Sequence, residues 1–108
     1  MRWIDYASPR STREAVDLLA EHGGRARIMA GGTDILVQLR AGRWELDLLV
    51  DGKNIAELNE LTYDPEGGLT LGAAVPCYRI YGNAAIARAY PGLIDSASLI
   101  GGVQIQGR

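Results

Sequence analysis

Two adjacent glycines mark the point in this sequence that is best suited to bind a ligand, within IMAGGTDI (28–35). Gly31 and Gly32 separate an apolar segment from one with helical periodicity, which Thr33 or Asp34 would open. Backbone N–H groups at such a bend lack partners, the helix start adds roughly half a positive charge, and glycine lets an anion approach the main chain. This pattern predicts a phosphate or diphosphate site, although a plain tight turn would use the same glycines.

The remaining reactive side chains have structural interpretations that are at least as good. Asp51 ends an apolar strand where a sheet edge could face a ligand, but capping of the following turn is favoured. Cys77 stands at an expected helix start, which favours a thiolate, yet a small buried residue is the preferred interpretation. His22 is expected to interact with the C-terminus of its helix. Core or interface packing is expected for Tyr78, Tyr81 and Tyr90. Trp3 and Trp44 could stack on a cofactor or pack, and the sequence favours neither.

Composition limits the partners of the chain. Its 108 residues carry 11 Lys and Arg against 13 Asp and Glu, a net charge of -2, which predicts no binding to nucleic acid. The apolar runs are too short for a membrane span, and no signal-peptide pattern opens the sequence. A single cysteine and a single histidine argue against an internal disulfide and against a zinc site. We expect a cytoplasmic protein without a metal site or an acid–base pair.

Helices and strands alternate around the glycine bend. A capping box of Ser11 and Glu14, in which each side chain accepts the other residue's backbone N–H, predicts a helix that ends at Gly23 and Gly24. The elements predicted next are a strand over 26–30, a helix over 33–42 and a strand over 45–52. This alternation is typical of a small parallel sheet with crossover helices.

The pattern changes after the second strand. Asn54 and Glu57 are expected to cap a helical turn over 54–61. The elements predicted next are a hairpin of strands 61–63 and 69–75, a helical segment over 78–100 broken at 82–83 and 91–92, and a strand beginning in 101–108. We therefore predict an α+β fold, with an α/β subdomain over 1–60 and the start of an antiparallel β subdomain over 61–108. Neither part looks complete, so we expect a fragment of a longer protein.

Four blocks give the sequence a family resemblance. They are AGGTDILVQLRAG (30–42), DLLVDGKNIAELNEL (47–61), GGLTLGAAVP (67–76) and YPGLIDSASLIGGVQIQGR (90–108). In order and spacing they resemble the start of the FAD-binding subunit or domain of molybdenum hydroxylases, the group of xanthine dehydrogenase, carbon monoxide dehydrogenase and aldehyde oxidase. The resemblance implies a PCMH-type FAD-binding fold, incomplete in this chain, with FAD between two subdomains.

The resemblance also implies which residues hold FAD. The segment that wraps the diphosphate consists of Ile28, Met29, Ala30, Gly31, Gly32, Thr33, Asp34 and Ile35, with main-chain amides as donors. The hydroxyl of Thr33 would add a donor, and Asp34 would cap the helix or face the adenosine end. A side chain at Gly32 would occupy the space of the diphosphate. Ile100 would lie near the isoalloxazine ring, with a core position as the alternative.

By the same resemblance, electrons from a substrate oxidised at the molybdenum cofactor reach FAD through [2Fe-2S] clusters and continue to NAD or another acceptor. The implied partners are a molybdopterin-binding large subunit and a [2Fe-2S] small subunit. Two alternatives are a flavoprotein reductase of the cell-wall precursor type, which the second and fourth blocks disfavour, and a structural fragment that binds no flavin. The fragment alone is expected to be inactive and to bind FAD poorly.

Overall fold

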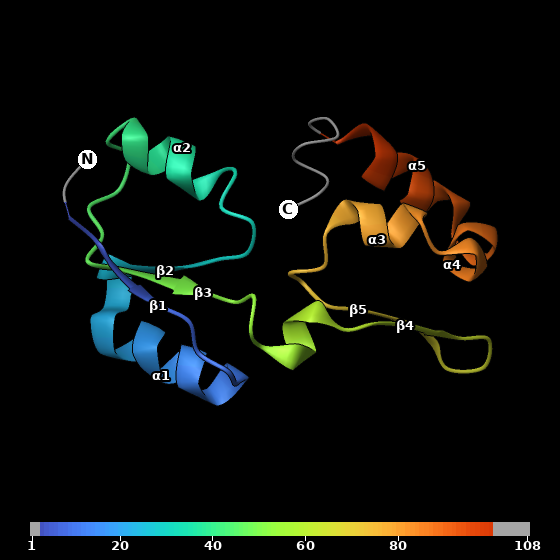
Figure 1. Ribbon diagram of the computed structural model, residues 1–108, viewed down its shortest axis with the longest axis horizontal. Coiled ribbons are helices and arrows are strands. Elements are labelled where there is room, and N and C mark those ends of the chain that lie inside the picture. The colour runs from blue at the N-terminus through green and yellow to red at the C-terminus, as the bar shows by residue number, and fades with distance from the viewer. Residues whose placement is uncertain (1–2, 101–108) are drawn as a thin grey trace. The chain divides into compact units, whose positions relative to one another are not determined.

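The computed structural model describes residues 3–100 of the chain (Figure 1). The chain divides into two compact units, Met1–Glu57 and Leu58–Arg108. Within the described residues, no helix has the length and hydropathy needed to cross a membrane.

A three-stranded parallel sheet forms the centre of the first unit. Its strands are β1 (Asp5–Ala7), β2 (Ala26–Met29) and β3 (Leu48–Asp51), in the order β1-β3-β2. The central strand β3 is buried along its whole length, as its apolar residues predict. Strand β1 was not predicted, because three residues with the exposed pair Asp5 and Tyr6 carry no strand periodicity.

Helix α1 (Thr12–His22) connects β1 to β2. Ser11 is its N-cap and accepts a hydrogen bond from the Glu14 backbone N–H at 3.1 Å, as predicted. The reciprocal half of the capping box is wrong, because the Glu14 carboxylate accepts from the Arg10 N–H at 3.2 Å, one residue earlier than expected. The helix ends at Gly23, whose φ is +57°, and the 3₁₀ turn η1 (Gly23–Arg25) leads into β2.

Helix α2 (Ile35–Arg40) connects β2 to β3. The two crossovers run in opposite directions across the sheet, so right-handed connections put α1 and α2 on opposite faces, as Figure 1 shows. A core cluster lies on the α2 side. Its buried residues are Leu39, Leu46 and Leu49, and the half-buried residues packed against them are Ile4, Met29, Ile35 and Trp44.

The expected caps of the segment after β3 are wrong. This segment contains the 3₁₀ turn η2 (Ala56–Asn59). The Asn54 amide nitrogen donates to the Ser8 hydroxyl at 2.7 Å, and the Glu57 carboxylate accepts from the Thr12 hydroxyl. Both side chains therefore connect this segment to the residues around the start of α1, which sequence-local reasoning does not detect.

The second unit begins with an antiparallel hairpin of β4 (Leu61–Asp64) and β5 (Gly68–Leu71), as predicted. Strand β5 ends four residues earlier than expected. Beyond its end, the Gly72 and Ala74 N–H groups donate to the backbone carbonyls of Glu60 and Leu58. Three short helices follow: α3 (Cys77–Tyr81), α4 (Ala84–Ala89) and α5 (Pro91–Leu99).

The predicted helix breaks have clear causes. Asn83 caps α4 by accepting from the Ala85 and Ile86 N–H groups, and Pro91 is the first residue of α5, so the second break lies at Tyr90. The buried centre of this unit is formed by Ile80, Ile86 and Ala97. The strand expected over 101–108 lies outside the described residues.

Candidate functional site

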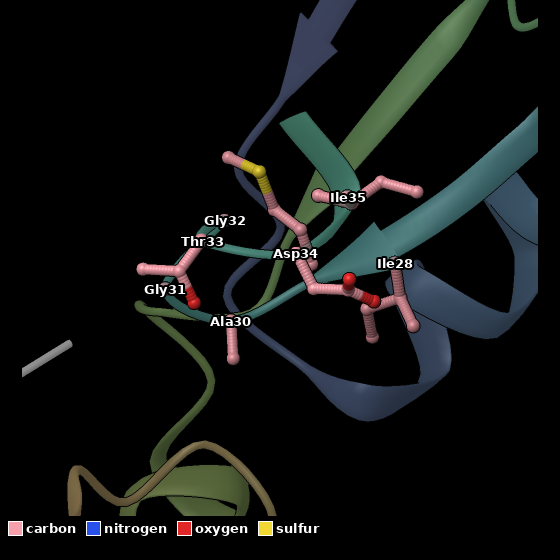
Figure 2. Close-up of a pocket in the computed structure, with 8 residues that line it drawn as sticks. Ile28, Ala30, Gly31, Gly32, Thr33, Asp34 and Ile35 are labelled. Carbon is pink, nitrogen blue, oxygen red and sulfur yellow. The ribbon is translucent and has the colours of Figure 1, made fainter. Parts of the chain in front are cut away.

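The glycine bend lies at the carboxyl edge of the parallel sheet. Strand β2 ends at Met29, whose carbonyl accepts the Gly52 N–H at 2.9 Å, and α2 begins six residues later at Ile35. A pocket of about 330 Å³ opens here. The residues that line it are Ile28, Met29, Ala30, Gly31, Gly32, Thr33, Asp34 and Ile35, the same eight as in the predicted site (Figure 2).

The bend that lines this pocket contains backbone N–H groups that make no hydrogen bond to the described residues. Among the described residues, no acceptor receives a hydrogen bond from the N–H groups of residues 31–35. The Gly32 carbonyl already accepts from the Leu36 N–H at 3.1 Å, which begins the helix. Because α2 has only six residues, its dipole is weaker than the half charge expected from the sequence. Five neighbouring donors, rather than the dipole, make this bend suited to an anion.

Gly32 is required by its backbone conformation. Its φ is +86°, which side-chain-bearing residues rarely adopt. A Cβ at this position would lie 3.2 Å from Leu36 Cδ1 and 3.5 Å from Met29 Sδ. A side chain at Gly32 would thus contact Leu36 and Met29 in a strained backbone conformation, so a loss of stability is expected in addition to any loss of space for the diphosphate.

Asp34 does not cap α2, contrary to one of the two expectations for it. It occupies the N-cap position, but its carboxylate accepts no backbone N–H there. Instead, Oδ2 accepts a hydrogen bond from Gln38 Nε2 at 2.6 Å. The Gln38 amide oxygen in turn accepts from the indole N–H of Trp44. Sequence reasoning missed Gln38, although the spacing of four residues between Asp34 and Gln38 on a helix signals such a pair.

The donor set fits a diphosphate. No lysine or arginine is among the lining residues, and their one charged side chain, Asp34, is bonded to Gln38. The pocket therefore offers neutral N–H groups and the exposed Thr33 side chain as donors. Backbone N–H groups at a glycine bend can approach phosphate oxygens closely, which suits the bridging group of a dinucleotide.

Asp51, at the end of β3, caps the following turn, which is the role that the sequence favoured. Its side chain is buried, its Oδ1 accepts the Lys53 backbone N–H at 2.9 Å, and its Oδ2 accepts the Tyr6 hydroxyl and lies 3.6 Å from Lys53 Nζ. The Tyr6 hydroxyl and the Asp51 carboxylate beside Lys53 raise the pKa of Lys53. Both oxygens of the carboxylate thus accept hydrogen bonds, one from the turn at Lys53 and the other from Tyr6 in β1.

The other candidates outside the bend have structural surroundings too. His22 Nδ1 lies 2.9 Å from the Leu18 carbonyl oxygen at the end of α1, as expected. Cys77 is half-buried against the core of the second unit rather than fully buried. Tyr90 packs edge-on against Tyr63, with ring centroids 5.8 Å apart.

The remaining aromatic candidates differ in exposure. Trp3 is 87% exposed and Tyr78 is 50% exposed. Tyr81 and Trp44 are half-buried against the cores of their units. Ile100 follows α5 in the second unit and is 55% exposed.

Comparison with known proteins decides the family. Residues 2–108 match the family described as FAD binding domain in molybdopterin dehydrogenase. The chain belongs to this family. The cofactor named in the family's description is FAD, as predicted, and membership favours the molybdenum hydroxylase group over the cell-wall precursor reductase type.

Relatives of this FAD-binding domain occur in several oxidoreductases. The xanthine dehydrogenase FAD-binding subunit of Escherichia coli O157:H7 is 34% identical over 104 residues, which cover 96% of this chain and 35% of that protein. The carbon monoxide dehydrogenase medium chain of Hydrogenophaga pseudoflava is 29% identical over 106 residues, with coverage of 97% and 36%. The chain therefore spans about a third of the length of these curated relatives.

Solved structures confirm the predicted mixed fold of helices and open sheets. Carbon monoxide dehydrogenase from Hydrogenophaga pseudoflava has a TM-score of 0.90 at 27% identity, over 99% of this chain and 37% of that chain. Quinoline 2-oxidoreductase from Pseudomonas putida 86 has a TM-score of 0.89 at 29% identity, with the same coverage.

Proposed function

We propose that this chain supplies the diphosphate-binding part of an FAD site in the FAD-binding component of a molybdenum hydroxylase. The observation that supports this most strongly is a run of five N–H groups, of residues 31–35, that have no acceptor among the described residues and belong to residues lining a pocket at the sheet edge. Buried or ligand-facing N–H groups need acceptors, and a diphosphate offers several within the span of one bend.

Each residue of the pocket has a proposed part. The amides of Gly31, Gly32 and Thr33 would donate to the diphosphate oxygens, and the Thr33 hydroxyl would add a donor. The residues that would form the walls are Ile28, Met29, Ala30, Asp34 and Ile35. Ile100 is proposed to lie near the isoalloxazine ring.

The FAD-binding component is proposed to work in a larger assembly. When bound, FAD would supply the redox chemistry, taking electrons from [2Fe-2S] clusters and passing them to NAD or another acceptor. The proposed partners are a molybdopterin-binding large subunit and a [2Fe-2S] small subunit in the cytoplasm. The names of the relatives support this, since one is a subunit of xanthine dehydrogenase and another is a medium chain.

Alanine at Gly31 tests the proposed site in the full-length protein. Among residues 3–100, the glycines with positive φ are Gly23, Gly32, Gly42 and Gly68, so alanine can adopt the Gly31 backbone conformation. Gly31→Ala keeps the backbone N–H, but its methyl group would hinder the close approach of the diphosphate. It should therefore weaken FAD binding about tenfold or more and leave the melting temperature of the apoprotein nearly unchanged.

Gly24→Ala is the matched control, because Gly24 also lacks a positive φ and a Cβ there would meet no atom within 4 Å. This control should change neither FAD affinity nor melting temperature. Unchanged FAD affinity in Gly31→Ala would contradict the proposed site.

A further inference from the structure

Three side chains of the first unit form a chain of hydrogen bonds beside the bend. The indole N–H of Trp44 donates to Gln38 Oε1, and Gln38 Nε2 donates to Asp34 Oδ2 at 2.6 Å. Asp34 stands at the start of α2, and Gln38 lies one helical turn further along. These hydrogen bonds thus connect Trp44, which packs against the core cluster of the first unit, to Asp34, which lines the pocket.

Trp44 determines which groups donate and which accept in this series of hydrogen bonds. Its ring is half-buried against the core cluster, and the Arg27 guanidinium lies 4.0 Å from the ring centroid. The indole nitrogen can only donate, so the Gln38 amide must turn its oxygen toward Trp44 and its NH₂ toward Asp34. The Asp34 carboxylate is the acceptor that this NH₂ group meets.

The hydrogen bond to Gln38 gives Asp34 a role that is unusual for a residue at the N-cap position. An aspartate at the N-cap ordinarily accepts N–H groups of the first helical turn and neutralises them. Here the carboxylate is bonded to Gln38 instead, and the N–H groups of residues 31–35 keep no acceptor among the described residues.

We propose that Gln38, oriented by Trp44, is a positioning residue that keeps the Asp34 carboxylate away from the N–H donors of the bend. This inference rests on the proposed function, in which these donors receive the diphosphate of FAD. Without Gln38, rotation of the Asp34 side chain lets the carboxylate cap the helix. The diphosphate then has to displace a competing acceptor that also repels it.

A double-mutant cycle in the full-length protein tests this inference. The variants are Gln38→Leu, Asp34→Asn and the pair together, and the control is Val37→Ala on an exposed position of the same helix. FAD affinity is measured by titration of the apoprotein, and the melting temperature of each apoprotein is recorded. Gln38→Leu should weaken FAD binding about tenfold, without lowering the apoprotein melting temperature more than Val37→Ala does.

Rescue distinguishes positioning from simple loss of packing. Asp34→Asn in the Gln38→Leu background should restore FAD affinity to within about twofold of the original, because the competing charge is gone. Trp44→Phe should weaken FAD binding in the same direction, because Gln38 loses its donor while the aromatic ring remains.

Three results would overturn the inference: unchanged FAD affinity in Gln38→Leu, no rescue by Asp34→Asn, or an equal loss of affinity in Asp34→Asn alone. The last would mean that the carboxylate contacts the cofactor itself. Failure of the proposed function is recognised separately, because Gly31→Ala would then leave FAD affinity unchanged as well.

Discussion

The backbone of Gly32 has a φ of +86°, and a Cβ added there would lie 3.2 Å from Leu36 Cδ1. We therefore expect Gly32→Ala to lower the free energy of unfolding by about 1–2 kcal/mol in the absence of FAD. Urea unfolding of the apoprotein measures this, with Gly24→Ala as the control that should change little. Loss of FAD binding with unchanged stability would instead mean that a side chain at Gly32 meets only the ligand.

Asp51 is the buried charged residue at the edge of the sheet in the first unit. Because its carboxylate accepts both the Tyr6 hydroxyl and the Lys53 N–H, Asp51→Ala should lower the free energy of unfolding by about 2–3 kcal/mol. Asp17→Ala, which removes an exposed ion pair with Arg13, should change it by less than about 0.5 kcal/mol. Similar small effects of both variants in urea unfolding would contradict the structural role of Asp51.

Among the elements, α1 depends most clearly on a local cap. Ser11→Ala removes the acceptor of the Glu14 N–H, so it should lower the free energy of unfolding by about 1 kcal/mol. Thermal unfolding followed by circular dichroism measures this. Ser96→Ala, which removes an exposed hydroxyl in α5 that donates to the Gly92 carbonyl, should have a smaller effect. Equal losses would mean that the cap is not the cause.

Elements with local signals were predictable from the sequence, and those that depend on distant partners were not. The cap of α1, the buried residues of β3 and the hairpin turn over 64–68 each have a local physical cause. Strand β1 forms only because its short backbone pairs with β3, and Asn54 bonds Ser8 rather than capping its own turn. Neither partner is visible from local periodicity.

The same division applies to the bend. Its place between β2 and α2 follows from a glycine pair between a strand and a helix, whereas the eight residues that line its pocket were implied by the family resemblance. The direction of the Asp34 carboxylate does not follow, because it depends on Gln38 and on Trp44, which lies ten residues further along the chain. Side-chain networks of this kind need the tertiary packing that positions their members.

At the scale of the whole molecule, this chain spans about a third of its curated relatives, and we expect it to bind FAD weakly when isolated. A single bend supplies a few hydrogen bonds of about 1.5–3 kcal/mol each. Association costs roughly 4–15 kcal/mol, and a long flexible ligand adds ordering entropy. Calorimetric titration of FAD into residues 1–108 should show binding weaker than micromolar. Micromolar or tighter binding would mean that this segment holds FAD without further parts of the protein.

The most direct test of the proposed site is a crystal structure of the full-length protein with FAD bound. The decisive measurement is the set of distances from the backbone nitrogens of Gly31, Gly32 and Thr33 to the diphosphate oxygens. We predict that at least two of these distances lie within about 3.2 Å, the range of an N–H···O hydrogen bond. A diphosphate bound elsewhere, with all three nitrogens beyond about 4 Å from its oxygens, would contradict the assignment of the bend as the diphosphate site.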